Sequence, residues 1–232
     1  MNLPKVKIQL RGEDGDIAAL KSCYFPPGCE IISEDNFAYL ILNELDSSLC
    51  VDEIKMQVED FLDRMNGVAR VVHPDYHVVS IGQILTLRAD GKYDQNILLP
   101  MLINRNVFFE HALITDSKPA KPFSQILVEA SYNDPLVREV LHYFNSENWV
   151  NLYKIYELIR YDVKTSKLIE WSSGNIITRF RLTAQSKKLI GDESRHADPS
   201  VAQPDRPMSI EEASILIRTF LRKWISSKMP TE

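Results

Sequence analysis

The sequence holds only eight glycines in 232 residues, and none of them forms a phosphate-binding loop of the GxGxxG or GxxxxGK[ST] type. It also lacks the GxSxG turn of many serine hydrolases. No apolar run approaches the roughly 18 residues that a membrane-spanning helix needs, and the first residues lack the apolar centre of a signal peptide. We therefore expect a protein without a membrane span, located in the cytoplasm.

Cysteine is also scarce, with single residues at Cys23, Cys29 and Cys50. An odd count without a CxxC pair, and without histidine at ligand spacing, argues against a disulfide framework and against a structural zinc site. Cys23 and Cys29 are close enough to pair across a turn, but small buried or half-buried thiols are the favoured interpretation. We expect no metal and no other cofactor.

Charge is unevenly distributed along the chain. Residues 1–120 carry 11 lysines and arginines against 18 aspartates and glutamates, whereas residues 121–232 carry 16 against 14. Binding of nucleic acid depends largely on neutralising phosphates, so an acidic first half disfavours nonspecific binding there. The weakly basic second half permits contact with RNA without predicting it.

The first 120 residues read as a mainly antiparallel β-sheet with one helix. Residues 30–43 place apolar side chains on both faces, which predicts a central strand covered on two sides. The helix is expected from Asp52 to Met65, with a stop at Asn66-Gly67. The expected strands are residues 5–10, 30–43, 68–72, 77–89 and 96–109, by alternation and turn signals.

The remaining residues read as an all-helical bundle. The stretch 117–122 has two prolines and no apolar period, which favours a boundary between a β-rich domain, 1–120, and a helical domain, 121–232. Asp134-Pro135 predicts a helix start, and further helices are expected over about 149–161 and 175–189. The last helix should begin with a capping box at Ser209–Glu212 and bury one apolar stripe, Ala213, Leu216, Ile217, Phe220, Leu221 and Trp224. The fold class is therefore predicted as α+β.

A dense polar segment between two expected helices, residues 191–198, contains the candidate catalytic pair Arg195 and His196. Imidazole titrates near neutral pH and guanidinium is a permanent cation, so the pair suits deprotonation of a hydroxyl beside a developing phosphate charge. Three nearby carboxylates are candidates for orienting the histidine: Asp192, Glu193 and Asp198. The other interpretation is a polar loop whose side chains cap helix ends, and the residue types alone favour it.

Other histidine pairings carry less chemical meaning. His73 and His77 are four residues apart, but Pro74 between them argues against helical metal-ligand spacing and favours a solvated turn. Arg70 precedes His77 by seven residues and Arg105 precedes His111 by six, both in the half that we read as β-rich, where such pairs lie far apart along a strand. If residues 106–114 were helical instead, Arg105 and His111 would be the better candidate pair.

Two resemblances rest on the C-terminal residues. The stretches 180–186, 191–197 and 207–213 resemble the C-terminal region of uncharacterised bacterial proteins. More distantly, the order of helices, polar Arg/His segment and long amphipathic helix is similar to HEPN domains. That resemblance implies a metal-independent ribonuclease, dimeric through its helical half, in which His196 activates a ribose hydroxyl and Arg195 holds the phosphate. HEPN nucleases separate the arginine from the histidine by four to six residues, whereas Arg195 and His196 are adjacent and would point about 100° apart on a helix.

Two functions of different class follow. The preferred one is a binding or scaffolding protein, in a bacterial defence or stress system, whose β-rich half recognises an unknown protein partner. The alternative is a metal-independent HEPN-like ribonuclease that uses Arg195 and His196.

Overall fold

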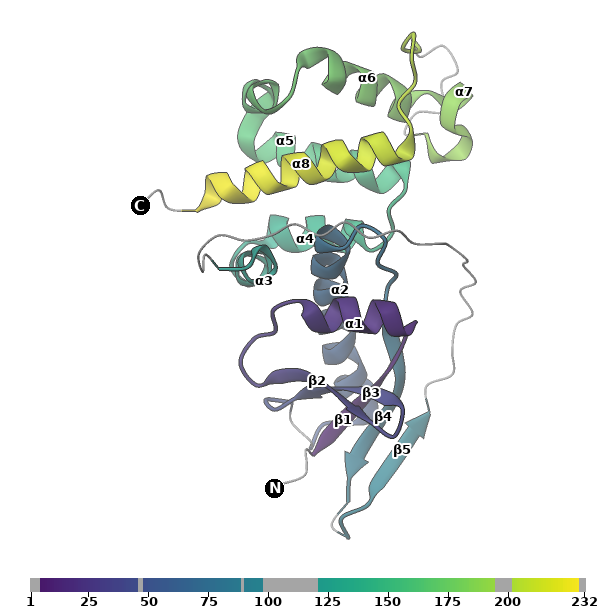
Figure 1. Cartoon of the computed structure of the whole chain (residues 1–232), viewed down its shortest axis with the longest axis vertical. Helices are drawn as coiled ribbons and strands as arrows, with labels where there is room; N and C mark the ends of the chain where they lie inside the picture. Colours follow the sequence, from purple (N-terminus) through teal and green to yellow (C-terminus); the bar gives the residue numbers. More distant parts are fainter. Residues whose placement is uncertain (1–4, 46–47, 89, 98–120, 195–201, 230–232) are drawn as a thin grey trace. The chain divides into compact units, whose positions relative to one another are not determined.

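The computed structural model describes residues 5–45, 48–88, 90–97, 121–194 and 202–229. These residues form an N-terminal antiparallel sheet followed mostly by helices, so the predicted α+β fold class is confirmed (Figure 1). They fall into two compact units, within Met1–Glu129 and Ala130–Glu232. The boundary predicted between residues 120 and 121 adjoins a stretch outside the described residues and stays a prediction.

The sheet of the first unit has five strands in the order β2-β3-β1-β4-β5, and every neighbouring pair is antiparallel. The strands are β1 (Val6–Arg11), β2 (Cys29–Glu34), β3 (Phe37–Leu42), β4 (Ser80–Leu87) and β5 (Tyr93–Ile97). The single strand predicted over 30–43 is therefore wrong, because Asp35 and Asn36 take φ values of 50° and 65° and turn the chain into a hairpin. Asparagine and aspartate tolerate this left-handed region, which two-residue hairpin turns require.

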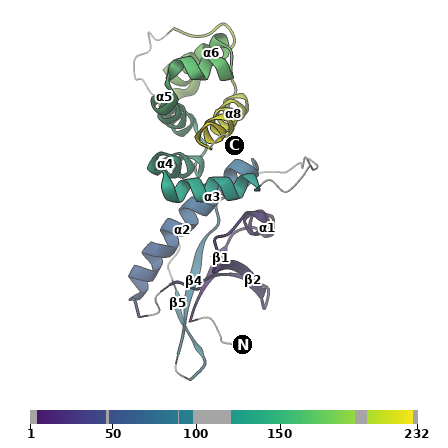
Figure 2. The same cartoon turned by 90° about the vertical axis from the view of Figure 1, so that its left-hand side faces the viewer.

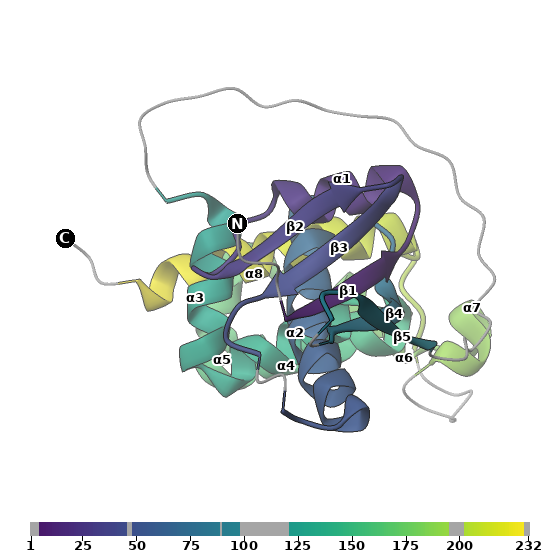
Figure 3. The same cartoon turned by 90° about the horizontal axis from the view of Figure 1, so that it is seen from below.

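Strand alternation decides which side chains face the helices. Ile8 lies opposite both Leu40 and Ile84 in the sheet register, and all three are fully buried. Figures 2 and 3 show helices α1 (Asp14–Ser22) and α2 (Val51–Val72) on one side of the strands, and Figure 3 looks onto the other side. No described helix of this unit lies on that other side, but Ile41 and Leu85, which face it, are buried, so β3 buries apolar residues on both faces.

Helix α2 is longer than predicted. It runs through Asn66-Gly67, where a stop was expected, and it includes residues 68–72, which were expected to form a strand. Glycine inside a helix costs about 1 kcal/mol relative to alanine. The last turns of α2 are buried on almost every side, and this packing outweighs the local preference.

Helix α1 was also missed, because only Asp16 and Leu20 of its nine residues are buried and its apolar pattern is weak.

The second unit is helical, as predicted. Its elements, with α3 spanning the division between the units, are α3 (Phe123–Asn133), α4 (Pro135–Phe144), α5 (Trp149–Trp171), α6 (Gly174–Gln185), α7 (Lys187–Ile190), the 3₁₀ turn η1 (Gly191–Glu193) and α8 (Ile210–Lys228). Asp134 caps α4 by accepting the Leu136 N–H at 2.9 Å, with Pro135 as the first helical residue. The capping box of Ser209 and Glu212 at the start of α8 is confirmed.

The core of the helical unit joins α8 to an aromatic cluster. The predicted stripe of α8, from Ala213 to Trp224, is buried along its whole length. Beside it, the Phe180 ring of α6 lies 5.5–6.3 Å from the rings of three residues of α5, Trp149, Tyr153 and Tyr156. Offset and edge-on ring pairs of this kind add roughly 0.5–1.5 kcal/mol each beyond the area that they bury.

Candidate functional site

The predicted catalytic segment is only partly described. Asp192 and Glu193 lie in η1, whereas Arg195, His196 and Asp198 lie outside the described residues, as do Arg105 and His111. Gly191 opens the turn with a φ of 62°, a conformation that favours glycine. The convergence of Arg195 with His196 therefore stays a prediction.

The two described carboxylates serve the local structure. Glu193 Oε2 accepts the backbone N–H of Trp149 at 3.2 Å, in the first turn of α5, where amide groups lack partners inside the helix. Asp192 is fully exposed, with its Oδ1 4.0 Å from Lys187 Nζ. These contacts match the polar loop that caps helix ends, and a role in orienting His196 stays a prediction.

The side of the sheet opposite α2 carries a different kind of surface, which we call the open face. Its exposed and half-buried apolar residues, on four strands that the register places on one side, are Ile32, Phe37, Tyr39, Leu87 and Tyr93, whereas Ile41 and Leu85 on the same side are buried. Phe37 is 51% exposed, and its ring meets the Tyr39 ring edge-on at 6.5 Å. Tyr39 and Tyr93 are half-buried, so the surface combines one exposed ring with two partly exposed ones, and contiguous apolar patches of this kind are typical of contact sites.

A buried lysine lies at the centre of the open face. Lys7 of β1 is 6% exposed, and its Nζ lies 5.5 Å from the centre of the Tyr39 ring and 4.9 Å from that of Tyr93. The same ammonium group forms an ion pair with Glu34. Desolvation raises the pKa of the Tyr93 phenol, and the charge of Lys7 opposes this rise. The ammonium group thus fixes two aromatic rings in place by cation–π attraction.

Sequence reasoning missed this arrangement because its members lie far apart in the chain. Lys7, Glu34, Tyr39 and Tyr93 come from four strands, and no spacing rule connects them. Lys7 gives no signal of its own in the sequence, because it occupies an ordinary polar position of an alternating strand, as Gln9 and Arg11 do.

A second polar cluster joins α1 to the loop between α2 and β4. The buried carboxylate of Asp16 accepts the backbone N–H of His77 at 2.8 Å, and its other oxygen lies 3.5 Å from His77 Nδ1. Ser22 Oγ lies 2.9 Å from His73 Nε2. The turn predicted at His73–His77 is present, but both histidines are half-buried rather than solvated, and the turn is held to α1 at two points.

The contact between Ser22 and His73 has the spacing of a nucleophile and its base. However, the Ser22 hydroxyl also lies 2.7 Å from the Ala19 carbonyl oxygen, to which it donates. Burial lowers the pKa of His73, which keeps the imidazole neutral near pH 7. A neutral imidazole and a serine that caps its own helix form a structural tether between α1 and the loop.

The neutral state of His73 predicts a pH dependence. The pKa of His73 in the folded protein is lower than its ordinary value, so the stabilising contribution is fully present above about pH 6.5 and is lost as the pH falls through the folded value. We expect the urea midpoint to fall between pH 7.5 and pH 5.5, and to fall less in His73→Gln. His142→Gln, which removes an exposed histidine, should retain the dependence of the unmodified protein. An unchanged dependence in His73→Gln would contradict the assignment.

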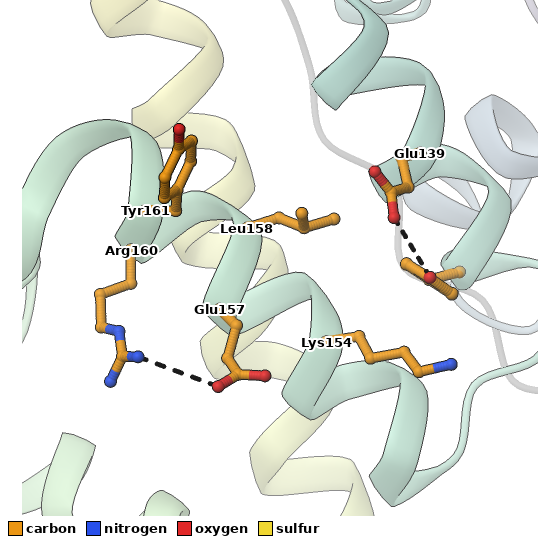
Figure 4. Close-up of a pocket in the computed structure, with 7 residues that line it drawn as sticks. Glu139, Lys154, Glu157, Leu158, Arg160 and Tyr161 are labelled. Atoms are coloured by element: carbon orange, nitrogen blue, oxygen red, sulfur yellow. Dashed lines mark hydrogen bonds and ion pairs between the residues drawn. The ribbon is translucent and has the colours of Figure 1, made fainter.

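The helical unit has a shallow pocket between α4 and α5, with a volume of about 410 Å³. Seven residues line it: Glu139, Tyr143, Lys154, Glu157, Leu158, Arg160 and Tyr161. Figure 4 shows Lys154 and Leu158 extending from α5 toward Glu139 of α4. Glu139 accepts the Tyr143 hydroxyl at 3.2 Å, and Lys154 Nζ lies 4.6 Å from the centre of the Tyr143 ring. With two acidic and two basic residues, this lining provides no excess positive charge for phosphate groups.

The described residues offer neither a metal site nor a reactive buried thiol. In the parts of the chain that the structure describes, no group of three or more histidine, cysteine, aspartate or glutamate side chains is placed to hold a metal ion. Cys23, Cys29 and Cys50 are free thiols, and burial raises the pKa of Cys23 to about 12, so this thiol is unreactive at neutral pH. Among the described helices, none combines the length and the apolar character that crossing a membrane requires.

The ribonuclease hypothesis has a direct test. If His196 activates a ribose hydroxyl, the purified protein should cleave structured RNA in EDTA, and His196→Ala should lower the rate by at least about 100-fold, the usual range for loss of a general base. His142→Ala, which changes an exposed histidine of α4, is the matched control. Cleavage that survives in His196→Ala would exclude the predicted role of His196.

Three comparisons with known proteins found no match to this chain: no family model matches it, and neither does any curated protein or solved structure. The resemblance to the bacterial family and to HEPN domains therefore stays a prediction.

Proposed function

We propose that the protein is a binding or scaffolding protein whose N-terminal unit recognises another protein through the open face of its sheet. The observation that carries the proposal is the half-exposed ring of Phe37 beside Tyr39, with Tyr93 on the same side of the sheet, which no described helix of the unit covers. Aromatic residues are enriched in the centres of protein interfaces, where they bury a large area at a low cost in side-chain entropy.

The rigidity of this surface supports the proposal. Lys7 lies against the Tyr39 and Tyr93 rings and is itself held by its ion pair with Glu34, which favours ordered rings before a partner binds. Binding to a surface that is already ordered loses less conformational entropy than binding to a mobile one. The acidic character of residues 1–120 favours a protein partner over nucleic acid.

A photo-crosslinking experiment tests the proposal. Phe37 is replaced by benzoylphenylalanine, and the chain is irradiated in the cells that naturally make it. We expect a small set of defined protein adducts from this position. The matched control places the same group at Met56, an apolar residue of α2 that is 66% exposed.

The identity of the crosslinked proteins shows whether Phe37 lies in a specific interface. Each adduct is identified by mass spectrometry, and its binding is measured again with purified proteins and with Phe37→Asp, which should weaken binding by about 2 kcal/mol or more if Phe37 is a central anchor. Equal labelling from Phe37 and Met56, or no adduct at Phe37, would contradict the proposal.

A further inference from the structure

Strand β2 forms one edge of the sheet. Its six residues, Cys29–Glu34, pair with β3 in one continuous register, and no described strand lies on its outer side. An edge strand leaves half of its backbone N–H and C=O groups directed outward, where another strand can pair with them. At the opposite edge, β5 leads directly into residues that the structure does not describe.

Natural edge strands are commonly protected against pairing by lysine, proline or a bulge. β2 contains neither lysine nor proline, and its pairing with β3 shows no shift in register. It presents Glu30 and Glu34 on the open face instead, with Ile32 between them. Both ends of the strand thus carry a carboxylate, of which Glu34 is already paired with Lys7 and Glu30 is exposed, and the centre of the strand is apolar.

The acidic character extends through the surrounding sequence. Between Lys21 and Lys55 the chain has seven aspartates and glutamates and no lysine or arginine. Glu30, Asp35 and Glu44 are exposed, and the one buried cation of the open face, Lys7, is supplied by β1. A partner of this hairpin therefore gains from positive charge.

A second copy of the chain is a poor occupant of this edge. Antiparallel pairing of two β2 strands with both open faces on the same side, centred on Ile32, would set Glu30 of each copy opposite Glu34 of the other. Like charges directly opposite one another destabilise a strand pair. The same geometry with a basic strand replaces both repulsions by attractions.

We propose that the outer edge of β2 binds an extended segment of a partner protein that carries lysine or arginine at alternate positions. The added strand would place basic side chains opposite Glu30 and Glu34 and an apolar side chain opposite Ile32. Backbone hydrogen bonds supply affinity in this mode of recognition, and the alternating side chains supply specificity. The inference rests on the proposed binding function and specifies its partner.

A synthetic strand tests the inference without knowledge of the natural partner. The probe is a blocked peptide, Thr-Lys-Val-Ile-Val-Lys-Thr, which matches the alternation of β2. Backbone amide shifts of the full chain are followed by NMR during titration. We expect saturable shifts at residues 29–34, and about tenfold weaker binding with Glu30→Lys.

Reversing the charge of the peptide as well provides a control for the case in which Glu30→Lys disturbs the fold. A peptide with glutamate in place of both lysines should bind Glu30→Lys more tightly than it binds the unmodified chain, because only the pairing of charges has changed. Asp75→Lys, the same charge change at an exposed loop residue, should bind the lysine peptide as the unmodified chain does.

Three outcomes would overturn the inference. The first is the absence of saturable shifts, and the second is binding that ignores both charge reversals. The third is protection of residues 29–34 from hydrogen exchange in the absence of peptide. Protection that rises with protein concentration would show that a second copy covers the edge, and protection independent of concentration would show that another part of the chain covers it. The crosslinks from Phe37 report on the proposed function separately, because that residue lies on β3 rather than on the β2 edge.

Discussion

Replacing Arg218 by methionine should lower the free energy of unfolding of the helical unit by about 3–5 kcal/mol, the usual cost of removing one partner of a buried ion pair. Arg218 Nη2 lies 3.1 and 3.0 Å from the two carboxylate oxygens of Glu147, and both side chains are about nine-tenths buried. Ser214 links the pair by donating to Glu147 and accepting from Arg218 Nε at 3.2 Å. In the variant, the negative charge of Glu147 remains buried without the guanidinium group that compensates it.

The measurement is chemical denaturation, with hydrogen exchange of α4, α5 and α8 to locate the loss. Arg222→Met, an exposed arginine one turn further along α8, is the matched control and should change stability little. The double variant Glu147→Gln, Arg218→Met should recover a large part of the loss, because the isolated buried charge is gone. A loss of less than 1 kcal/mol in Arg218→Met would show that Glu147 reaches water or another partner.

Replacing Asn66 by leucine should destabilise the N-terminal unit by about 3 kcal/mol. The substitution leaves buried backbone groups without hydrogen-bond partners, and each such group costs roughly 1–3 kcal/mol of stability. The Asn66 amide donates to the Val79 carbonyl at 2.9 Å and accepts from the Val79 N–H at 3.1 Å. Its oxygen also accepts the Tyr76 hydroxyl. These bonds hold the segment that leads into β4, and hence the strand that lies beside β1.

A graded series separates this mechanism from a general loss of packing. Tyr76→Phe removes one hydroxyl and should cost about 1 kcal/mol, whereas Gln57→Leu, at an exposed position of the same helix, should cost little. Hydrogen exchange should show faster opening at Tyr76–Val79 in Asn66→Leu. If Asn66→Leu and Tyr76→Phe cost the same, the bonds to Val79 do not carry the stability assigned to them.

Elements with strong local signals could be predicted well. Asp134-Pro135 satisfies free amides and fixes the first φ of a helix, so α4 begins where the residue types require it. The capping box at Ser209 and the stripe behind it determine α8 in the same way. The antiparallel sheet also follows from alternation along short segments, as in β1.

Elements decided by burial could not be predicted. Gly67 signals the end of a helix, yet α2 continues to Val72 because its last turns are packed on almost every side. The hairpin at Asp35-Asn36 is a different case, because the four consecutive polar residues Ser33–Asn36 are a turn signal that the prediction of a single strand passed over. Sequence patterns report a local preference, and packing overrides it when enough area is buried.

The candidate site shows the same division. The sequence by itself determined the α+β class, the capped helices of the second unit and the acidic character of the first. It also drew attention to Arg195 and His196, because residue types concentrated in a short segment are visible without a fold. The tertiary structure alone decided that Lys7, Glu34, Tyr39 and Tyr93 meet on one face of the sheet. The physical reason is register: which strands become neighbours depends on hydrogen bonds between segments far apart in the chain, and a one-residue slip would turn every one of these side chains to the opposite face.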